Sequence, residues 1–114
     1  MNLSELAGKL SGYEVVHIDL LNIDVKVKRL SLAELQDVDR LVNACSTGSG
    51  KNKQVTNTSK LVFNIVTKYF TDVDGQPIAG DNTEDDVKEW PGELVKQLMT
   101  AYGNVNGTDE DPNS

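Results

Sequence analysis

Hydrophobic and polar residues alternate through two consecutive segments near the start of the chain, Tyr13–Leu20 and Ile23–Arg29. A period of two is typical of a half-buried strand. Leu21 and Asn22 lie between the segments, and asparagine tolerates the left-handed backbone conformation of a tight bend. We therefore expect a β-hairpin with one apolar face, formed by Val16, Ile18, Leu20, Ile23, Val25 and Val27.

The period changes from two to that of a helix at Ser31. Ser31 is followed three residues later by Glu34, the pattern of a capping box, in which each side chain binds a backbone N–H of the other residue. The residues that follow predict an apolar stripe on one helix face, Leu32, Leu35, Val38 and Val42, widened by Leu41 and Cys45. Because an isolated hairpin is only marginally stable, we expect this helix to cover it.

Two short helices are expected elsewhere. Leu3, Leu6 and Leu10 share one face of a first helix that ends at Gly12, and so few turns are stable only when they dock on other structure. A second short helix is expected after Thr83, because acidic residues follow it where the helix dipole favours negative charge.

Two longer segments complete the pattern. Lys60–Phe70 is rich in β-branched residues, which leaves a strand open, but its length and a cap at Thr58 or Ser59 favour a helix. The last helix is expected to begin at Pro91 and to end at Gly103. Its apolar stripe consists of Leu94, Val95, Leu98 and Tyr102.

These elements predict an α+β fold that is dominated by helices, with an N-terminal β-hairpin packed against three to four α-helices. Residues 1–12 form a short N-terminal helix or arm, and residues 13–105 form a single domain. Residues 46–59 are expected to be a mobile surface loop, because the stretch Ser46–Gln54 contains glycines and no apolar residue. Residues 106–114 are expected to be a disordered acidic tail.

Charge narrows the classes of partner. The 114 residues carry a net charge of −7, which argues against a general nucleic-acid binder. From Thr58 onward eleven acidic residues face only four lysines, so the second half carries the whole excess. The single cysteine, Cys45, excludes an internal disulfide. The start lacks the features of a secretory signal and no segment is apolar enough to span a membrane, so we expect a cytoplasmic protein.

No motif predicts catalysis, a cofactor or a metal. The stretch Gly48–Lys51 resembles a phosphate-binding loop, but Cys45 stands where that pattern requires glycine. Asp72, Asp74 and Gly75 resemble part of a calcium loop, in which Phe70 would occupy the first ligand position. His17 is the only histidine and is expected on the solvent face of its strand. We therefore expect a protein that is not an enzyme.

The order of elements resembles the tail assembly chaperones of long-tailed bacteriophages over roughly residues 13–107. The resemblance lies in a strand pair that ends in VKVKRLSLAE (25–34), a helix, a polar loop, a second helix that closes on FTDVDGQP (70–77), and a last helix from Trp90-Pro91 to YGNVN (102–106). The loop at 46–59 is long for this layout, and the N-terminal helix has no counterpart in it.

The resemblance implies a role in the host cell cytoplasm as a protein that binds other proteins. Members of this family bind the phage tape measure protein, keep it soluble and help to recruit the tail tube protein. An apolar helix face is a suitable surface for such a partner. We expect it on the last helix, with contributions from the helix after Ser31: Trp90, Leu94, Leu98, Tyr102, Leu35 and Val42.

Two other functions remain open from the sequence. The chain is also compatible with a structural tail or connector subunit, which would stay in the finished phage particle. An acidic DNA mimic that inhibits a DNA-binding enzyme would use carboxylates as stand-ins for phosphates, namely Asp72, Asp74, Asp81, Glu84, Asp85, Asp86 and Glu89. A homo-oligomer is possible, but no heptad pattern or long edge strand demands one.

Overall fold

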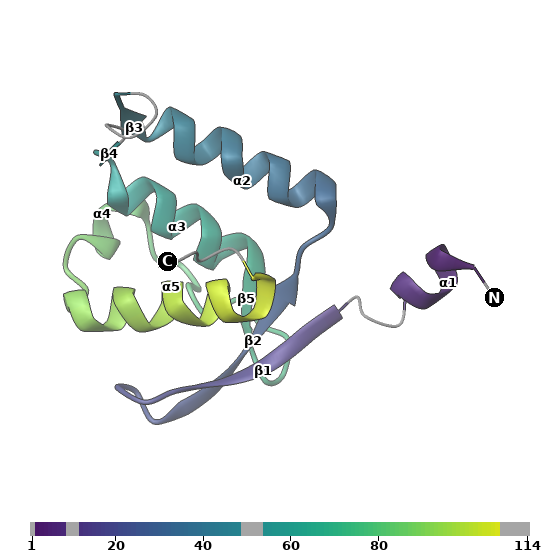
Figure 1. The fold of residues 1–114 in the computed structure, drawn as a ribbon. Helices are drawn as coiled ribbons and strands as arrows, with labels where there is room; N and C mark the ends of the chain where they lie inside the picture. The colour runs from purple at the N-terminus through teal and green to yellow at the C-terminus, as the bar shows by residue number, and fades with distance from the viewer. Residues whose placement is uncertain (1, 9–11, 49–53, 108–114) are drawn as a thin grey trace.

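The computed structural model describes residues 2–8, 12–48 and 54–107. Its elements are α1 (Leu3–Gly8), β1 (Gly12–Ile18), β2 (Ile23–Arg29), α2 (Leu32–Ala44), β3 (Ser46–Thr47), β4 (Gln54–Val55), α3 (Thr58–Tyr69), β5 (Phe70–Asp72), α4 (Glu84–Val87) and α5 (Gly92–Asn106). The fold is α+β and about half helical, with a small antiparallel sheet, as the sequence predicts (Figure 1).

The main sheet has the strand order β1-β2-β5. β1 and β2 form the expected antiparallel hairpin, in which Val16 lies opposite Val25. Asn22 adopts a φ of 54° at the bend, so the predicted left-handed residue is confirmed. β5 was not predicted: it follows α3 directly and pairs with β2, with Phe70 opposite Val27.

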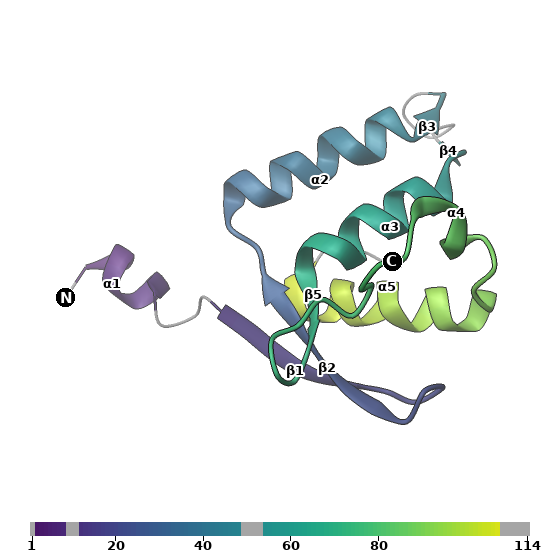
Figure 2. The ribbon, with the colours of Figure 1, turned by 180° about the vertical axis from the view of Figure 1, so that it is seen from behind.

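The core lies between the sheet and the helices. Ile18, Val25 and Val27 of the hairpin are at most 1% exposed. α3 lies between α2 and α5 in both views, and α5 contacts β1 and β2 (Figures 1 and 2). The helices contribute Val38, Val62, Ile65, Val66, Tyr69, Val87, Leu98, Ala101 and Tyr102 to this core.

The capping box at the start of α2 is confirmed. The Ser31 hydroxyl accepts a hydrogen bond from the Glu34 backbone N–H, and the Glu34 carboxylate accepts one from the Ser31 N–H. α2 is nevertheless weakly buried, because Val38 is its only buried residue. The expectation that Leu32 belongs to the buried stripe is wrong: its side chain is 71% exposed at the first turn.

The ambiguous segment before Phe70 is helical. Val62, Ile65, Val66 and Tyr69 are buried at the spacing of one helix face, which a strand would not give. The N-cap is Asn57, whose side chain accepts the Lys60 backbone N–H, rather than the expected Thr58 or Ser59.

The bend of the hairpin differs from the expected pattern. Leu20 and Ile23 were assigned to the apolar core face, but they are 48% and 45% exposed. They lie at the bend, where Gln97 of α5 accepts a hydrogen bond from the Leu20 N–H while both apolar side chains stay exposed. Alternation predicts which face a residue occupies, but it does not show how far the covering layer reaches.

Other segments differ in their boundaries. Within the expected loop 46–59, β3 and β4 pair with each other and α3 already begins at Thr58, while residues 49–53 lie outside the described part. The last helix continues through the buried Gly103 to Asn106 and ends at Gly107, which has a φ of 64°. Of the expected acidic tail, residues 108–114 also lie outside the described part.

Candidate partner-binding groove

An open groove of about 940 Å³ lies where the end of β2, the start of α2 and the end of α5 meet. Its polar lining comes from Lys28, Arg29, Ser31, Glu34 and Asn106, and its apolar lining from Leu30, Leu32, Leu35 and Val105. Gly8 and Gly12, at the end of α1 and the start of β1, also line it. We refer to this surface as the β2–α2 groove.

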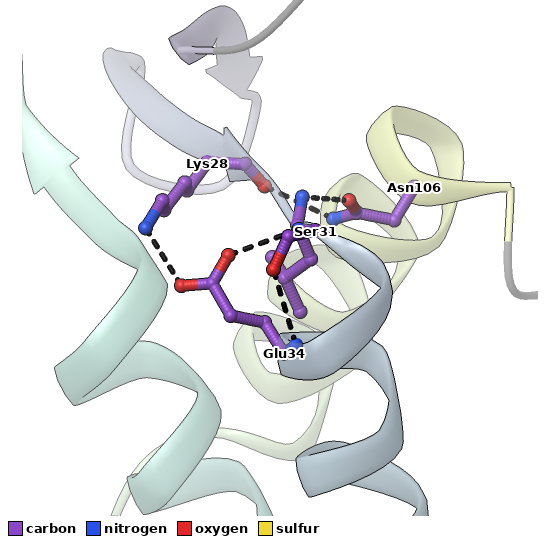
Figure 3. Close-up of polar contacts among 5 residues, drawn as sticks. Lys28, Ser31, Glu34 and Asn106 are labelled. Carbon is purple, nitrogen blue, oxygen red and sulfur yellow. Dashed lines mark hydrogen bonds and ion pairs between the residues drawn. The ribbon is translucent and has the colours of Figure 1, made fainter. Parts of the chain in front are cut away.

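Asn106 holds one wall of the groove in place. Its Oδ1 accepts a hydrogen bond from the Leu30 N–H at 2.8 Å, and its Nδ2 donates to the Lys28 carbonyl at 3.1 Å. The amide therefore pairs with the backbone at the end of β2 and fixes the end of α5 there (Figure 3). Nδ2 also donates to the carbonyl of Tyr102, one turn earlier.

Glu34 connects the start of α2 with the end of β2, which form the other walls of the groove. Besides its part in the capping box, its Oε2 lies 2.7 Å from Lys28 Nζ (Figure 3). The hydrogen bond from Lys28, together with that from the Ser31 N–H, lowers the pKa of Glu34 below its usual value. The same contact raises the pKa of Lys28. The pair is about one-third exposed, so it positions α2 against β2 more than it stabilises the fold.

Two of the predicted partner-binding residues lie on α2. Leu35 lines the groove and is half-buried. Val42 is two turns further along, half-buried, and packs against the core. Because α2 and α5 run in opposite directions (Figure 1), the C-terminal part of α2 lies toward the start of α5 rather than toward the groove.

The four predicted residues around the last helix separate into two pairs. Leu98 and Tyr102 are 2% and 6% exposed, so in this conformation they are core residues and cannot contact a partner. Trp90 and Leu94 are half-buried near the start of α5. α5 is 15 residues long, which places them roughly 20 Å from Asn106.

The Tyr102 hydroxyl is buried and has no hydrogen-bond partner among the described residues. Burial raises the pKa of Tyr102 to about 12, with smaller contributions from Tyr69 and Asp39. The phenol therefore stays neutral at physiological pH.

A smaller groove of about 280 Å³ lies between α2 and α3. Asp37, Arg40 and Lys68 place charges around it, and Asp37 accepts a hydrogen bond from Arg40. The apolar part of its lining consists of Val38, Leu41 and Tyr69. The β2–α2 groove is the larger of the two and offers more apolar surface.

The other candidate chemistry stays apart from the groove. His17 lies on the exposed face of β1, as expected, and its Nδ1 is 2.8 Å from an Asp24 oxygen. The hydrogen bond to Asp24 raises the pKa of His17. Cys45 is buried at the end of α2. Among the described residues, no three side chains that could ligate a metal lie together.

Sequence reasoning missed Val105, Asn106 and Leu30 as groove residues. Asn106 was assigned to the tail because Gly103 gave an earlier stop signal than Gly107. The Ser31–Glu34 pattern was the one local signal that pointed to this place, and it was interpreted as helix capping alone.

Comparison with known proteins gives a fold likeness. No protein-family model matches the chain, and no curated protein matches it. Among solved structures it is similar to that of the bacteriophage HK97 tail assembly chaperone, at 19% identity and a TM-score of 0.52. The match covers 91% of this chain and 92% of the other, and thus supports the expected resemblance at the level of the fold.

Proposed function

We propose that the chain is a tail assembly chaperone that works in the host cell cytoplasm. Its partners are the tape measure protein, which it keeps soluble, and the tail tube protein, which it helps to recruit. The observation that carries the proposal is the fold likeness to the HK97 tail assembly chaperone over nine-tenths of both chains. None of the helices in the described segments is long and apolar enough to cross a membrane.

The β2–α2 groove is the proposed binding site for a segment of the tape measure protein. An amphipathic helix binds by placing its apolar face in a hydrophobic groove. Leu30, Leu32, Leu35 and Val105 offer such a surface. Leu32 is 71% exposed, and an exposed leucine at the mouth of a groove gains most from being covered by a partner.

The polar residues of the groove are already paired within the chain. Glu34 binds Lys28 and Ser31, and Asn106 binds the β2 backbone. A partner therefore gains apolar contacts there without replacing these bonds. Such a contact is modest, which suits a chaperone that must be displaced during assembly. Trp90 and Leu94 remain a proposed second contact at the far end of α5.

The experiment is co-expression with the tape measure protein from the same phage. We expect the chain to keep that protein soluble and to co-purify with it. Leu32→Asp leaves the fold intact because an acidic residue is favourable in the first turn of a helix. It lowers the affinity for the tape measure protein by at least about tenfold. Val55→Asp is the matched control, since Val55 is 42% exposed on β4, outside the groove.

Each outcome is informative. Equal binding by both variants contradicts the groove as the site, whereas no binding by the wild-type chain contradicts the chaperone function. Retention of the chain in finished particles indicates a structural tail or connector subunit. Recovery of a DNA-binding enzyme indicates a DNA mimic, although Asp86 is already engaged in capping Thr83.

A further inference from the structure

Three exposed apolar side chains lie together at the bend between β1 and β2. Leu20, Leu21 and Ile23 are 48%, 47% and 45% exposed. The whole segment 19–24 is exposed, although Val25 directly after it is fully buried. Single exposed leucines need no explanation, but neighbouring ones that form a patch mark an interaction surface.

Backbone hydrogen bonds hold the bend in one conformation. Asn22 adopts a φ of 54°, and its N–H donates to the carbonyls of Ile18 at 2.8 Å and of Asp19 at 3.1 Å. The Leu21 N–H donates to the Ile18 carbonyl as well. Because an ordered surface loses less conformational entropy when a partner binds, this bend presents its apolar side chains in a form that favours binding.

Gln97 attaches the bend to α5. Its Oε1 accepts a hydrogen bond from the Leu20 N–H at 2.9 Å. Leu94 lies three residues before Gln97 and is therefore its neighbour on the helix surface. Leu94 is half-buried, so the second contact proposed at the start of α5 continues the exposed patch. We refer to Leu20, Leu21, Ile23 and Leu94 as the bend surface.

Two carboxylates flank the bend surface. The side chains of Asp19 and Asp24 are 88% and 54% exposed. Asp19 Oδ1 lies 3.7 Å from His17 Nε2, and Asp24 Oδ1 lies 2.8 Å from His17 Nδ1. Neither carboxylate forms an ion pair with a lysine or an arginine of the described segments. An apolar patch with acidic edges complements an apolar pocket with a basic rim, and we therefore expect that chemistry on the partner.

The bend surface and the β2–α2 groove lie at opposite ends of the hairpin (Figures 1 and 2). Gly12, the first residue of β1, lines the groove, and Ile18, the last residue of β1, precedes the bend. The seven residues of β1 separate the two places by roughly 20 Å. A partner in the groove therefore leaves the bend surface free, and two partners can be bound at once.

We propose that the bend surface is a second partner site, at which Leu20, Leu21 and Ile23 enter an apolar pocket with a basic rim on a folded protein. The assignment rests on the proposed function, in which the chain recruits the tail tube protein while it holds the tape measure protein. The groove takes a segment of the tape measure protein, and the bend surface takes the tail tube protein. The buried apolar side chains supply the affinity, and the carboxylates accelerate the encounter.

The first test measures the affinity of the chain for the tail tube protein of the same phage by biolayer interferometry. Leu21→Ser removes an apolar side chain from the bend surface and is expected to raise the dissociation constant at least about tenfold. Leu3→Ser is the matched control, because Leu3 is 81% exposed on α1, beyond the other end of the hairpin. The control is expected to bind like the wild-type chain. Unchanged binding by Leu21→Ser, or an equal loss in both variants, overturns the proposal.

The second test concerns the charge beside the bend surface. Asp19→Asn keeps the apolar side chains and is expected to lower the association rate about threefold. Added salt slows the association of the wild-type chain, because it screens the attraction between exposed charges. Asp39→Asn is the control, since Asp39 is exposed on α2, away from the hairpin. An association rate that neither salt nor Asp19→Asn changes contradicts a partner with a basic rim.

A third comparison separates the bend surface from the groove. Leu32→Asp is expected to lose affinity for the tape measure protein and to keep the tail tube protein, whereas Leu21→Ser does the reverse. If the wild-type chain binds the tape measure protein but not the tail tube protein, the bend proposal fails and the groove stands. If it binds only the tail tube protein, and does so through Leu21, the groove fails and the bend proposal stands.

Circular dichroism shows whether the variants fold. If Leu21→Ser does not fold, Leu20→Ala replaces it, and the same affinity comparison decides. A lower molar mass of Leu21→Ser than of the wild-type chain in light scattering would assign the patch to a second copy and overturn the proposal.

Discussion

The hairpin and the helical body use similar apolar residues in different ways. In the body, Val66 and Leu98 are 0% and 2% exposed, whereas Leu20 and Leu21 at the hairpin bend are 48% and 47% exposed. The middle of the hairpin resembles the body in its burial, because Val25 and Val27 are fully buried beneath the helices. The difference is therefore not one of sequence pattern. It depends on whether a second layer covers the side chain: at the bend α5 contacts the backbone through Gln97, but the leucine side chains stay exposed.

The comparison also separates stability from association. Residues covered within the chain stabilise the fold, because their burial removes apolar surface from water on folding. Residues left uncovered contribute little to folding and become available for a partner. On this view the body carries the stability, and α1 with the hairpin leaves apolar side chains exposed.

One substitution made in both regions tests this view most strongly. Leu98→Ala leaves a cavity in the core and is expected to lower the free energy of unfolding by about 2–5 kcal/mol. Leu20→Ala, at the exposed bend, is expected to lower it by about 0.5 kcal/mol or less. Denaturant unfolding followed by the fluorescence of Trp90, the single tryptophan, measures both. Equal losses would contradict the comparison.

The link between the two regions is the next target. Asn106→Ala removes the bonds from the end of α5 to Leu30 and Lys28 and leaves the Leu30 N–H without its acceptor. We expect a loss of about 1–3 kcal/mol in the free energy of unfolding. Asn104→Ala is the control, because Asn104 is exposed on the same helix. A loss no larger than that of the control would show that water replaces the asparagine without cost.

Local signals explain what the sequence predicted well. The hairpin, the bend at Asn22 and the capping box at Ser31 depend on neighbouring residues, and each is present. β5 could not be predicted in this way, because a three-residue strand exists only through its pairing with β2, more than forty positions earlier. The choice between helix and strand for Lys60–Phe70 was settled by length, which sequence does show.

The groove was harder to predict than the fold. Leu35 was identified as a binding residue, but Asn106 and Val105 reach the groove only because α5 runs past Gly103. Leu98 and Tyr102 have the same apolar spacing as a binding stripe, and a stripe in sequence does not reveal whether it faces a partner or the core. Three-dimensional packing decides that question.

The ion pair between Lys28 and Glu34 gives a smaller, pH-dependent effect. The pKa of Glu34 is lowered in the folded chain, so its stabilising contribution is fully present above the ordinary value of about 4.3. It is lost as the pH falls through the lower folded-state pKa. The free energy of unfolding of the wild-type chain should therefore fall more steeply below about pH 4 than that of Glu34→Gln. Parallel pH profiles for the two proteins would contradict this role.

The smallest effect is expected inside the core itself, at Tyr102. Its hydroxyl is buried without a partner, and a buried unsatisfied group costs free energy in the folded state. Tyr102→Phe removes that hydroxyl and keeps the ring, so we expect the free energy of unfolding to stay constant or to rise by up to about 1 kcal/mol. Tyr13→Phe, on the exposed face of β1, is the control and should change nothing. A clear loss of stability in Tyr102→Phe would mean that the hydroxyl makes a hydrogen bond after all, for example to an ordered water. The buried polar group of this core would then be paired, although no protein atom pairs with it.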